Sequence, residues 1–225
     1  MISLFSGTPG SGKSLNACRE IRIFLKSCGP VIGTFSINPD CLIKNSKYEY
    51  KYIDIYKLEP KYLVEFSKQH KKKNGNPEGS FLLVIDEAQR LFNSRSLNAP
   101  NRGDWITFFA EHRHLGFDII LISQNDRMLD RQIRSLIEFN FVHRKYSQFG
   151  FVGRIFALFT GQFVVVKIWY PLKEKVSAYF FRGSKKLYNF YDSYQLFGAV
   201  EEGDKGAPDD TATEADEKKV VNFPT

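Results

Sequence analysis

Eight residues near the start of the chain combine glycines, a lysine and a serine at a spacing suited to holding phosphate. Gly7–Ser14 reads GTPGSGKS and fits the pattern G-x-x-x-x-G-K-[ST]. The apolar run Met1–Phe5 precedes it, and Leu15–Lys26, with helical apolar spacing, follows it. Glycines let the backbone wind tightly with its N–H groups turned inward, and the helix start adds partial positive charge. The strand–loop–helix context therefore favours a phosphate site over a flexible glycine turn.

The last two residues of this loop have separate chemical tasks. The Lys13 ammonium can reach the β- and γ-phosphates of a nucleotide, and the Ser14 hydroxyl can ligate Mg²⁺. The loop residues that we predict to bind the nucleotide are Gly7, Thr8, Pro9, Gly10, Ser11, Gly12, Lys13 and Ser14.

A second reactive group follows an apolar run of strand length. Phe81–Glu87 reads FLLVIDE, with two acids at the end of the run. Asp86 can hold Mg²⁺ through its water shell, and Glu87 can polarise the attacking water as general base. Many strands end in acids, so this string alone is weak evidence. It becomes informative because the same chain also carries the phosphate loop. We predict Ser14 and Asp86 as the metal ligands.

Two further residues are candidates for the reaction. Gln124 ends the run FDIILISQ and would lie at the same sheet edge as the phosphate loop, where its amide could sense the γ-phosphate or orient water. The alternative is an ordinary turn residue. Arg113, in the string EHRH, could act as an arginine finger on a neighbouring subunit, or be a surface or ion-paired residue. The histidines beside it do not make a metal site without further ligands.

Strand-length apolar runs alternate with helical stretches, which indicates βαβ units and a parallel sheet. After His143 two apolar runs flank a turn, Phe163–Tyr170 and Val176–Arg182, and predict an antiparallel hairpin added to the sheet. The predicted fold class is therefore an α/β sandwich with a mostly parallel sheet between helices. The predicted strands are Met1–Phe5, Val31–Phe35, Phe81–Ile85, Phe117–Ile122 and Phe139–His143, with Tyr50–Ile55 as a candidate edge strand; the predicted helices are Leu15–Lys26, Lys61–Gln69, Trp105–His112 and Met128–Ile137.

Charge is unevenly distributed along the 225 residues. Residues 201–225 hold eight acids and three lysines, which leaves 29 Lys and Arg against 17 Asp and Glu, a net charge of +12, in residues 1–200. A basic body suits a polyanion or an anionic membrane face, and a solvated basic surface is the plainer alternative. Three cysteines without a C-x-x-C pair indicate reduced residues in the cytosol. We expect a domain over 1–200 and an acidic, disordered tail over 201–225.

Four strings in this order resemble the zonular occludens toxin family, which includes the gene I assembly protein of filamentous phages. They are GTPGSGKS, FLLVIDEAQRLF, EHRHLGFDIILISQ and YDSYQLF, and the resemblance covers roughly residues 1–198. It implies an additional-strand, catalytic-glutamate P-loop ATPase related to the motor domains of DNA-pumping proteins, with ATP and Mg²⁺ as ligands. It also implies a part in extruding phage particles through the host inner membrane. Lys13, Ser14, Asp86, Glu87 and Gln124 fall on the family's motif positions.

Longer members of the family carry a membrane-spanning helix, and no segment of this chain matches one. The best candidate, Phe151–Tyr170, is interrupted by Arg154 and Lys167, and its longest charge-free piece, Ile155–Val166, is too short to cross a bilayer. We therefore expect a protein in the host cytoplasm, at the cytoplasmic face of the inner membrane, without a transmembrane helix. The aromatic stretch Phe149–Tyr170 could attach it peripherally to anionic lipid, or could belong to the core hairpin.

The function predicted on this basis is ATP hydrolysis that drives filamentous phage assembly and extrusion. A DNA-translocating or packaging ATPase is the main alternative, and a nucleotide-gated scaffold without hydrolysis is disfavoured by Glu87. The expected partners are further copies of this chain in a ring, other phage assembly proteins, the host inner membrane, and single-stranded DNA or a phage DNA–protein complex.

Overall fold

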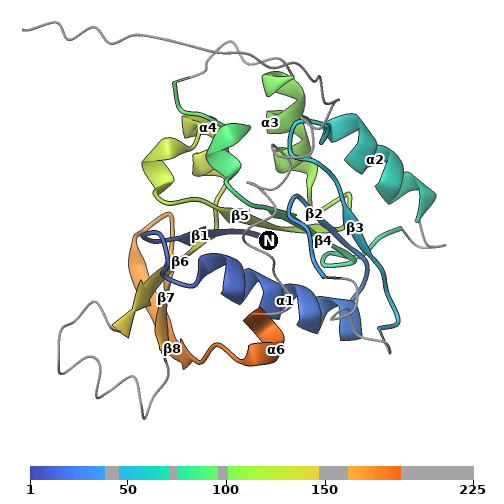
Figure 1. The fold of residues 1–225 in the computed structure, drawn as a ribbon. Coiled ribbons are helices and arrows are strands. Elements are labelled where there is room, and N and C mark those ends of the chain that lie inside the picture. The colour runs from blue at the N-terminus through green and yellow to red at the C-terminus, as the bar shows by residue number, and fades with distance from the viewer. Residues whose placement is uncertain (39–45, 71–74, 96–100, 147–161, 189–225) are drawn as a thin grey trace, which may run out of the picture. The chain divides into compact units, whose positions relative to one another are not determined.

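The computed structural model describes residues 1–38, 46–70, 75–95, 101–146 and 162–188, which fold around one eight-stranded sheet (Figure 1). The strand order is β3-β2-β4-β5-β1-β6-β7-β8. The strands are β1 Ile2–Ser6, β2 Val31–Gly33, β3 Tyr50–Tyr52, β4 Phe81–Ile85, β5 Phe117–Ile122, β6 Phe139–Lys145, β7 Phe163–Trp169 and β8 Glu174–Phe181. Every predicted strand is present, and β3 lies at the edge of the sheet as expected.

The direction of the strands changes once across the sheet. Every neighbouring pair from β3 to β6 is parallel. β7 pairs antiparallel with β6, from Phe139 opposite Trp169 to Lys145 opposite Phe163, and β8 pairs antiparallel with β7. The predicted fold class, a mostly parallel sheet with an added antiparallel hairpin, is confirmed.

Helices cover both faces of the sheet (Figure 1). The helices α1 Lys13–Ser27 and α6 Lys185–Tyr188 lie on one face, and α2 Pro60–Gln69, α3 Arg102–Glu111 and α4 Arg131–Ser135 lie on the other. Two 3₁₀ turns, η1 Ala88–Arg90 and η2 Asp126–Met128, follow β4 and β5. Within the described ranges, no helix has both the length and the apolar character that a bilayer crossing requires.

The helix predicted over Met128–Ile137 is wrong in its extent. Met128 ends η2, Leu129 is extended, and the helix α4 is only five residues long. Asp130 explains the break, because its carboxylate caps α4 by accepting from the Gln132 N–H at 2.8 Å and also accepts from Arg102. Capping of a new helix at Asp130 requires a non-helical backbone there, which periodicity alone does not reveal.

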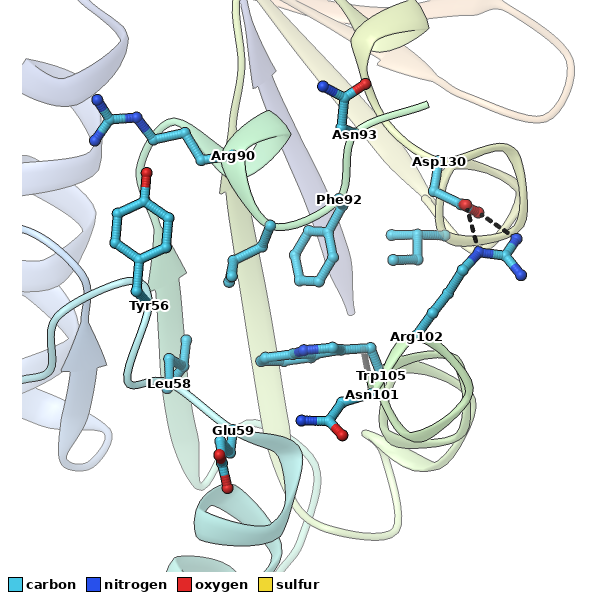
Figure 2. A pocket seen from close by; sticks show the side chains of 12 residues that line it. Tyr56, Leu58, Glu59, Arg90, Phe92, Asn93, Asn101, Arg102, Trp105 and Asp130 are labelled. Atoms are coloured by element: carbon cyan, nitrogen blue, oxygen red, sulfur yellow. Dashed lines mark hydrogen bonds and ion pairs between the residues drawn. The ribbon is translucent and has the colours of Figure 1, made fainter. Parts of the chain in front are cut away.

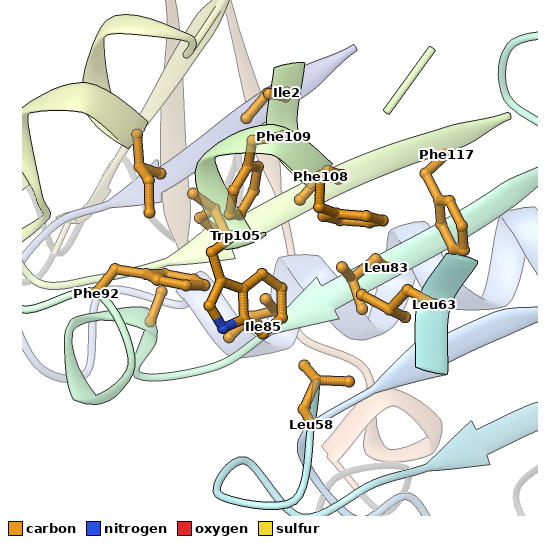
Figure 3. Packing of buried hydrophobic residues seen from close by; sticks show 14 of the residues in the cluster. Ile2, Leu58, Leu63, Leu83, Ile85, Phe92, Trp105, Phe108, Phe109 and Phe117 are labelled. Atoms are coloured by element: carbon orange, nitrogen blue, oxygen red, sulfur yellow. The ribbon is translucent and has the colours of Figure 1, made fainter. Parts of the chain in front are cut away.

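Side chains on the central strands are buried on both faces, as the continuous run in β4 predicts. Leu83 and Ile85 pack on the α2–α3–α4 side against an aromatic cluster (Figure 3), while Leu82 and Val84 face α1. The aromatic cluster consists of Phe92, Trp105, Phe108, Phe109 and Phe117, all 5% exposed or less. Two hydrophobic cores, one on each face of the sheet, therefore hold β4, β5 and β1 in register.

This register brings the functional strings to one edge. Ile85 of β4 lies opposite Leu121 of β5, and Phe5 of β1 lies opposite Ile122, so three parallel strands end side by side. The predicted acidic tail 201–225, the string YDSYQLF and Cys41 lie outside the described residues, while Cys18 and Cys28 are free cysteines.

Candidate functional site

The phosphate loop depends on glycine at two points of close approach. A Cβ on Gly7, where φ is 143°, would lie 2.4 Å from the His143 carbonyl oxygen. A Cβ on Gly12, where φ is 91°, would lie 2.7 Å from the Phe163 ring. Gly12 is also the N-cap of α1 and offers no side chain to its first turn. The N–H groups of that turn thus have no cap to satisfy them and can serve an anion.

Lys13 bridges the loop. Its ammonium donates to the carbonyl oxygens of Gly7 at 2.9 Å and Thr8 at 3.0 Å. Burial lowers the pKa of the Lys13 ammonium, and the negative charges of Asp86 and Glu87 oppose that change. The predicted nucleotide-binding lysine is therefore held over the loop, within electrostatic reach of both predicted acids.

Ser14 and Asp86 meet, although they are far apart in the sequence. The Ser14 hydroxyl donates to Asp86 Oδ2 at 3.3 Å, and the Asp86 N–H donates to Thr34 Oγ1 at 2.9 Å. Burial raises the pKa of Asp86 to about 6, while hydrogen bonds from the Glu87 N–H and Ser14 favour the charged form. A hydroxyl beside a partly buried carboxylate fits Mg²⁺, which takes few protein oxygens and completes its shell with water and phosphate. A bound cation would also offset the cost of burying this charge.

Glu87 lies on a strained turn at the end of β4. Its backbone is left-handed, with φ 49° and ψ 44°, which is uncommon outside glycine. The Glu87 N–H donates to Asp86 Oδ1 at 2.9 Å, and the Glu87 carbonyl accepts from the Arg90 N–H at 2.8 Å. The turn therefore fixes the predicted general base directly beside the predicted metal ligand.

Gln124 lies next to the phosphate loop, as predicted. It follows β5, its carbonyl accepts from the Gly7 N–H at 3.3 Å, and its side chain is exposed. An exposed amide at this edge can contact a bound nucleotide. The part that Gln124 takes in the reaction stays a prediction.

Arg113 is at the opposite edge of the sheet. It precedes β5, and its guanidinium forms an ion pair at 2.8 Å with Glu138, which directly precedes β6. Five-residue strands such as β1 separate this edge from the phosphate loop by roughly 16 Å. Arg113 therefore cannot reach the phosphate loop of its own chain, and action on a neighbouring subunit stays a prediction.

Two residues that support the loop were not predicted from the sequence. The Asn16 amide, fully buried in α1, donates to the Tyr179 hydroxyl at 3.0 Å and contacts His143 Nε2 at 3.0 Å. His143 Nδ1 lies 2.8 Å from the Phe141 carbonyl, so Nδ1 carries the proton and Nε2 accepts from Asn16. Burial lowers the pKa of His143 to about 4, which keeps it neutral. A polar residue among buried helical positions is the signal that could have revealed Asn16.

A cavity of about 310 Å³ opens beside η1, on the side of α3 and α4 (Figure 2). Phe92 and Trp105 pack edge to face in its wall, with ring centroids 5.0 Å apart. Arg102 donates to Asp130 at 2.8 Å, and although burial raises the pKa of Asp130, this contact holds it below the usual value. The ion pair ties the start of α3 to the start of α4.

The family model of the zonular occludens toxin (Zot) matches residues 1–196. The chain belongs to the Zot family. Two curated relatives are the Gene 1 protein of Enterobacteria phage f1, 36% identical over 130 residues, and ORF301 of Pseudomonas phage Pf3, named as a candidate assembly protein, 31% identical over 145 residues. The f1 match covers 52% of this chain and 37% of the relative, and the Pf3 match covers 61% and 40%. The matched segments of this Zot-family chain thus cover less than half the length of both relatives.

Solved structures share the fold of this Zot-family chain. The N-terminal domain of the zonular occludens toxin from Neisseria meningitidis matches with a TM-score of 0.50 and 18% identity, over 85% of this chain and 98% of that domain. B204, the DNA-packaging ATPase of Sulfolobus turreted icosahedral virus, matches with a TM-score of 0.52 and 18% identity, over 79% of this chain and 96% of B204. The predicted P-loop NTPase fold is confirmed.

Proposed function

We propose that this chain binds ATP with Mg²⁺ and hydrolyses the γ-phosphate. The observation that supports this most directly is the meeting of Lys13, Ser14, Asp86 and Glu87 at one sheet edge, from two segments far apart in the sequence. A glycine turn without a ligand has no need of a partly buried carboxylate against the loop serine.

Each residue has one task in this proposal. The loop N–H groups, from Gly7 to Ser14, bind the phosphates, and Lys13 exchanges its loop carbonyls for phosphate oxygens. Ser14 and Asp86 hold Mg²⁺, which when bound would neutralise phosphate charge. Glu87 takes the proton of the attacking water, and Gln124 orients that water or senses the γ-phosphate.

We propose that hydrolysis drives filamentous phage assembly and extrusion, through contacts with other phage assembly proteins at the cytoplasmic face of the host inner membrane. Membership of the Zot family and similarity to the Gene 1 proteins and to Pf3 ORF301 support this. The net charge of +12 over residues 1–200 suits an anionic membrane surface.

A DNA-translocating or packaging ATPase is the second candidate. B204, with the same fold, is a DNA-packaging ATPase, and the basic body of this chain would also suit a nucleic acid. Turnover in the presence of single-stranded DNA or of anionic vesicles separates the two. Stimulation by vesicles alone favours extrusion at the membrane, and stimulation by DNA alone favours translocation.

The variant Glu87→Gln tests the proposed chemistry. It keeps the shape of the side chain and removes the base, so ATP binding should persist while turnover falls by about 10²-fold or more. Calorimetry measures the binding and phosphate release measures the turnover. A variant that retained most of its turnover would place the base elsewhere.

We also propose that the chain acts as a ring in which Arg113 reaches the site of a neighbour. Arg113→Ala should bind ATP normally and turn over slowly. Mixing Arg113→Ala with Glu87→Gln should restore activity, because some interfaces then combine an intact Glu87 with an intact Arg113. If both variants oligomerise and no mixing ratio restores turnover, Arg113 has no role across the interface.

A further inference from the structure

The carboxylate of Glu87 has a hydrogen-bond partner that the sequence motifs do not mark. Gln89, two residues further along and inside η1, donates its side-chain Nε2–H to Glu87 Oε2. Both side chains are half-buried. An uncharged donor therefore engages one oxygen of the residue to which we assign the proton transfer.

The Gln89 amide has only one favourable orientation in this contact. Its other atom, Oε1, is shielded from solvent, and within the described residues no hydrogen-bond donor meets it. Turning the amide over would set Oε1 against a carboxylate oxygen, so only the present orientation is favourable.

Backbone hydrogen bonds also help to fix the position of Glu87. The left-handed turn at Glu87 is tied by its N–H to Asp86 and by its carbonyl to the Arg90 N–H. These bonds fix the Cα of Glu87 and leave its side-chain torsions free. Among the residues that the structure describes, the Gln89 amide is the hydrogen-bond partner that restrains the carboxylate itself.

From these contacts we propose that Gln89 is a positioning residue for Glu87. Its amide holds one carboxylate oxygen, so that the other oxygen faces the attacking water in the orientation for proton transfer. The inference rests on the proposed function of Glu87. Reaction rates depend steeply on such alignment, since a misplacement of about 1 Å can cost about 10²-fold. A glutamine suits the task because it donates without adding charge beside Asp86 and Lys13.

Gln89→Met in the full chain tests the inference, because methionine has a similar length and no donor. We expect kcat to fall about tenfold with KM for ATP unchanged, by analogy with the tenfold or larger loss when a group that orients a metal ligand is removed. Gln69→Met, at the exposed end of α2, is the matched control and should match wild type. Thermal unfolding should show Gln89→Met folded at the assay temperature.

A double-mutant cycle shows whether Gln89 acts through Glu87. In the Glu87→Gln background, Gln89→Met should change kcat by less than about twofold, because the group that it positions is already lost. A full tenfold loss in that background, or an unchanged kcat in the single variant, would overturn the inference.

Side-chain amide NMR tests the contact without hydrolysis. The ¹⁵N-labelled Gln89 amide signal, assigned by its loss in Gln89→Met, should shift in Glu87→Ala while the Gln69 signal does not. A Gln89 signal indifferent to Glu87→Ala would overturn the inference alone. A wild-type chain that binds ATP but never hydrolyses it would overturn the proposed function, and this inference with it.

Discussion

At the carboxyl edge of the parallel strands, Lys13, Asp86 and Glu87 share a partly buried space. At the amino edge, the Met1 amino group pairs with Asp118 at 2.8 Å, and Arg113 pairs with Glu138 at 2.8 Å. The amino-edge side chains are 28–50% exposed, so water already solvates them. Asp86 at the carboxyl edge is partly buried, and desolvation raises its pKa to about 6.

The two edges of the sheet differ in whether their charged and polar groups are paired within the protein. At the amino edge each of these charged groups already has a partner of opposite charge. Because these ion pairs are solvated, they contribute little to stability. The carboxyl edge combines an uncapped helix start, a lysine held on loop carbonyls and a partly buried acid, which a ligand carrying phosphate and Mg²⁺ would complete. The predictions below test this contrast.

The largest effect is expected at Gly7. In Gly7→Ala the new Cβ meets the His143 carbonyl at 2.4 Å and the φ of 143° disfavours it, so stability should fall by about 3 kcal/mol. Gly10→Ala is the matched control, because Gly10 shares the cost of a positive φ, 71°, while nothing lies within 4 Å of its Cβ position. Urea unfolding measures both. Equal losses would mean that the loop is not tightly packed against β6.

The next largest effect is expected on the pH dependence of folding stability, and it comes from His143. The folded-state pKa of about 4 is below the ordinary value of 6.5, so the stability contributed by neutral His143 is present above pH 6.5 and is lost as pH falls toward 4. The loss attributable to this group should be roughly 3 kcal/mol, from the size of the pKa difference. The nearby Lys13 charge acts in the same direction as burial.

His143→Gln isolates that contribution, since glutamine keeps a donor and an acceptor and does not titrate. Between pH 7 and 4.5 the wild type should lose more stability than His143→Gln in denaturant titrations. Parallel losses would contradict a neutral, buried histidine behind the loop.

Lys13→Ala should lower ATP affinity by about tenfold or more, because a charge-assisted hydrogen bond contributes about 1.5–3 kcal/mol. Arg113→Ala removes an equal charge at the other edge and should leave ATP affinity unchanged. Calorimetry compares the two. An equal loss in both variants would indicate a diffuse charge effect and would remove the contrast between the edges.

The smallest effect is expected for the stability of Arg113→Ala. The ion pair with Glu138 is half-exposed on the arginine side, so its loss should cost less than about 1 kcal/mol. Urea unfolding at low and high salt measures it. A loss of several kcal/mol would show that the amino edge, too, depends on its charges.

Much of the fold followed from local pattern. The apolar run of β4 and the alternation of strands and helices predict a parallel sheet, and the loop glycines predict the phosphate site without any tertiary information. The Met128–Ile137 helix failed because Asp130 caps a shorter one while binding Arg102, a partner 28 residues away. Hydrophobic periodicity depends only on residues close together in the sequence. It therefore cannot predict that a carboxylate binds a residue far away in the sequence.

The sequence by itself determined which residues we propose for the chemistry: Lys13, Ser14, Asp86 and Glu87 stand in motifs whose spacing is local. Only the tertiary structure decided how they meet, because the Ser14–Asp86 contact depends on the order in which β1, β5 and β4 pair. It alone also separated Arg113 from the site and brought Asn16 to His143. Side-chain packing between distant segments sets these contacts, and no local spacing encodes it.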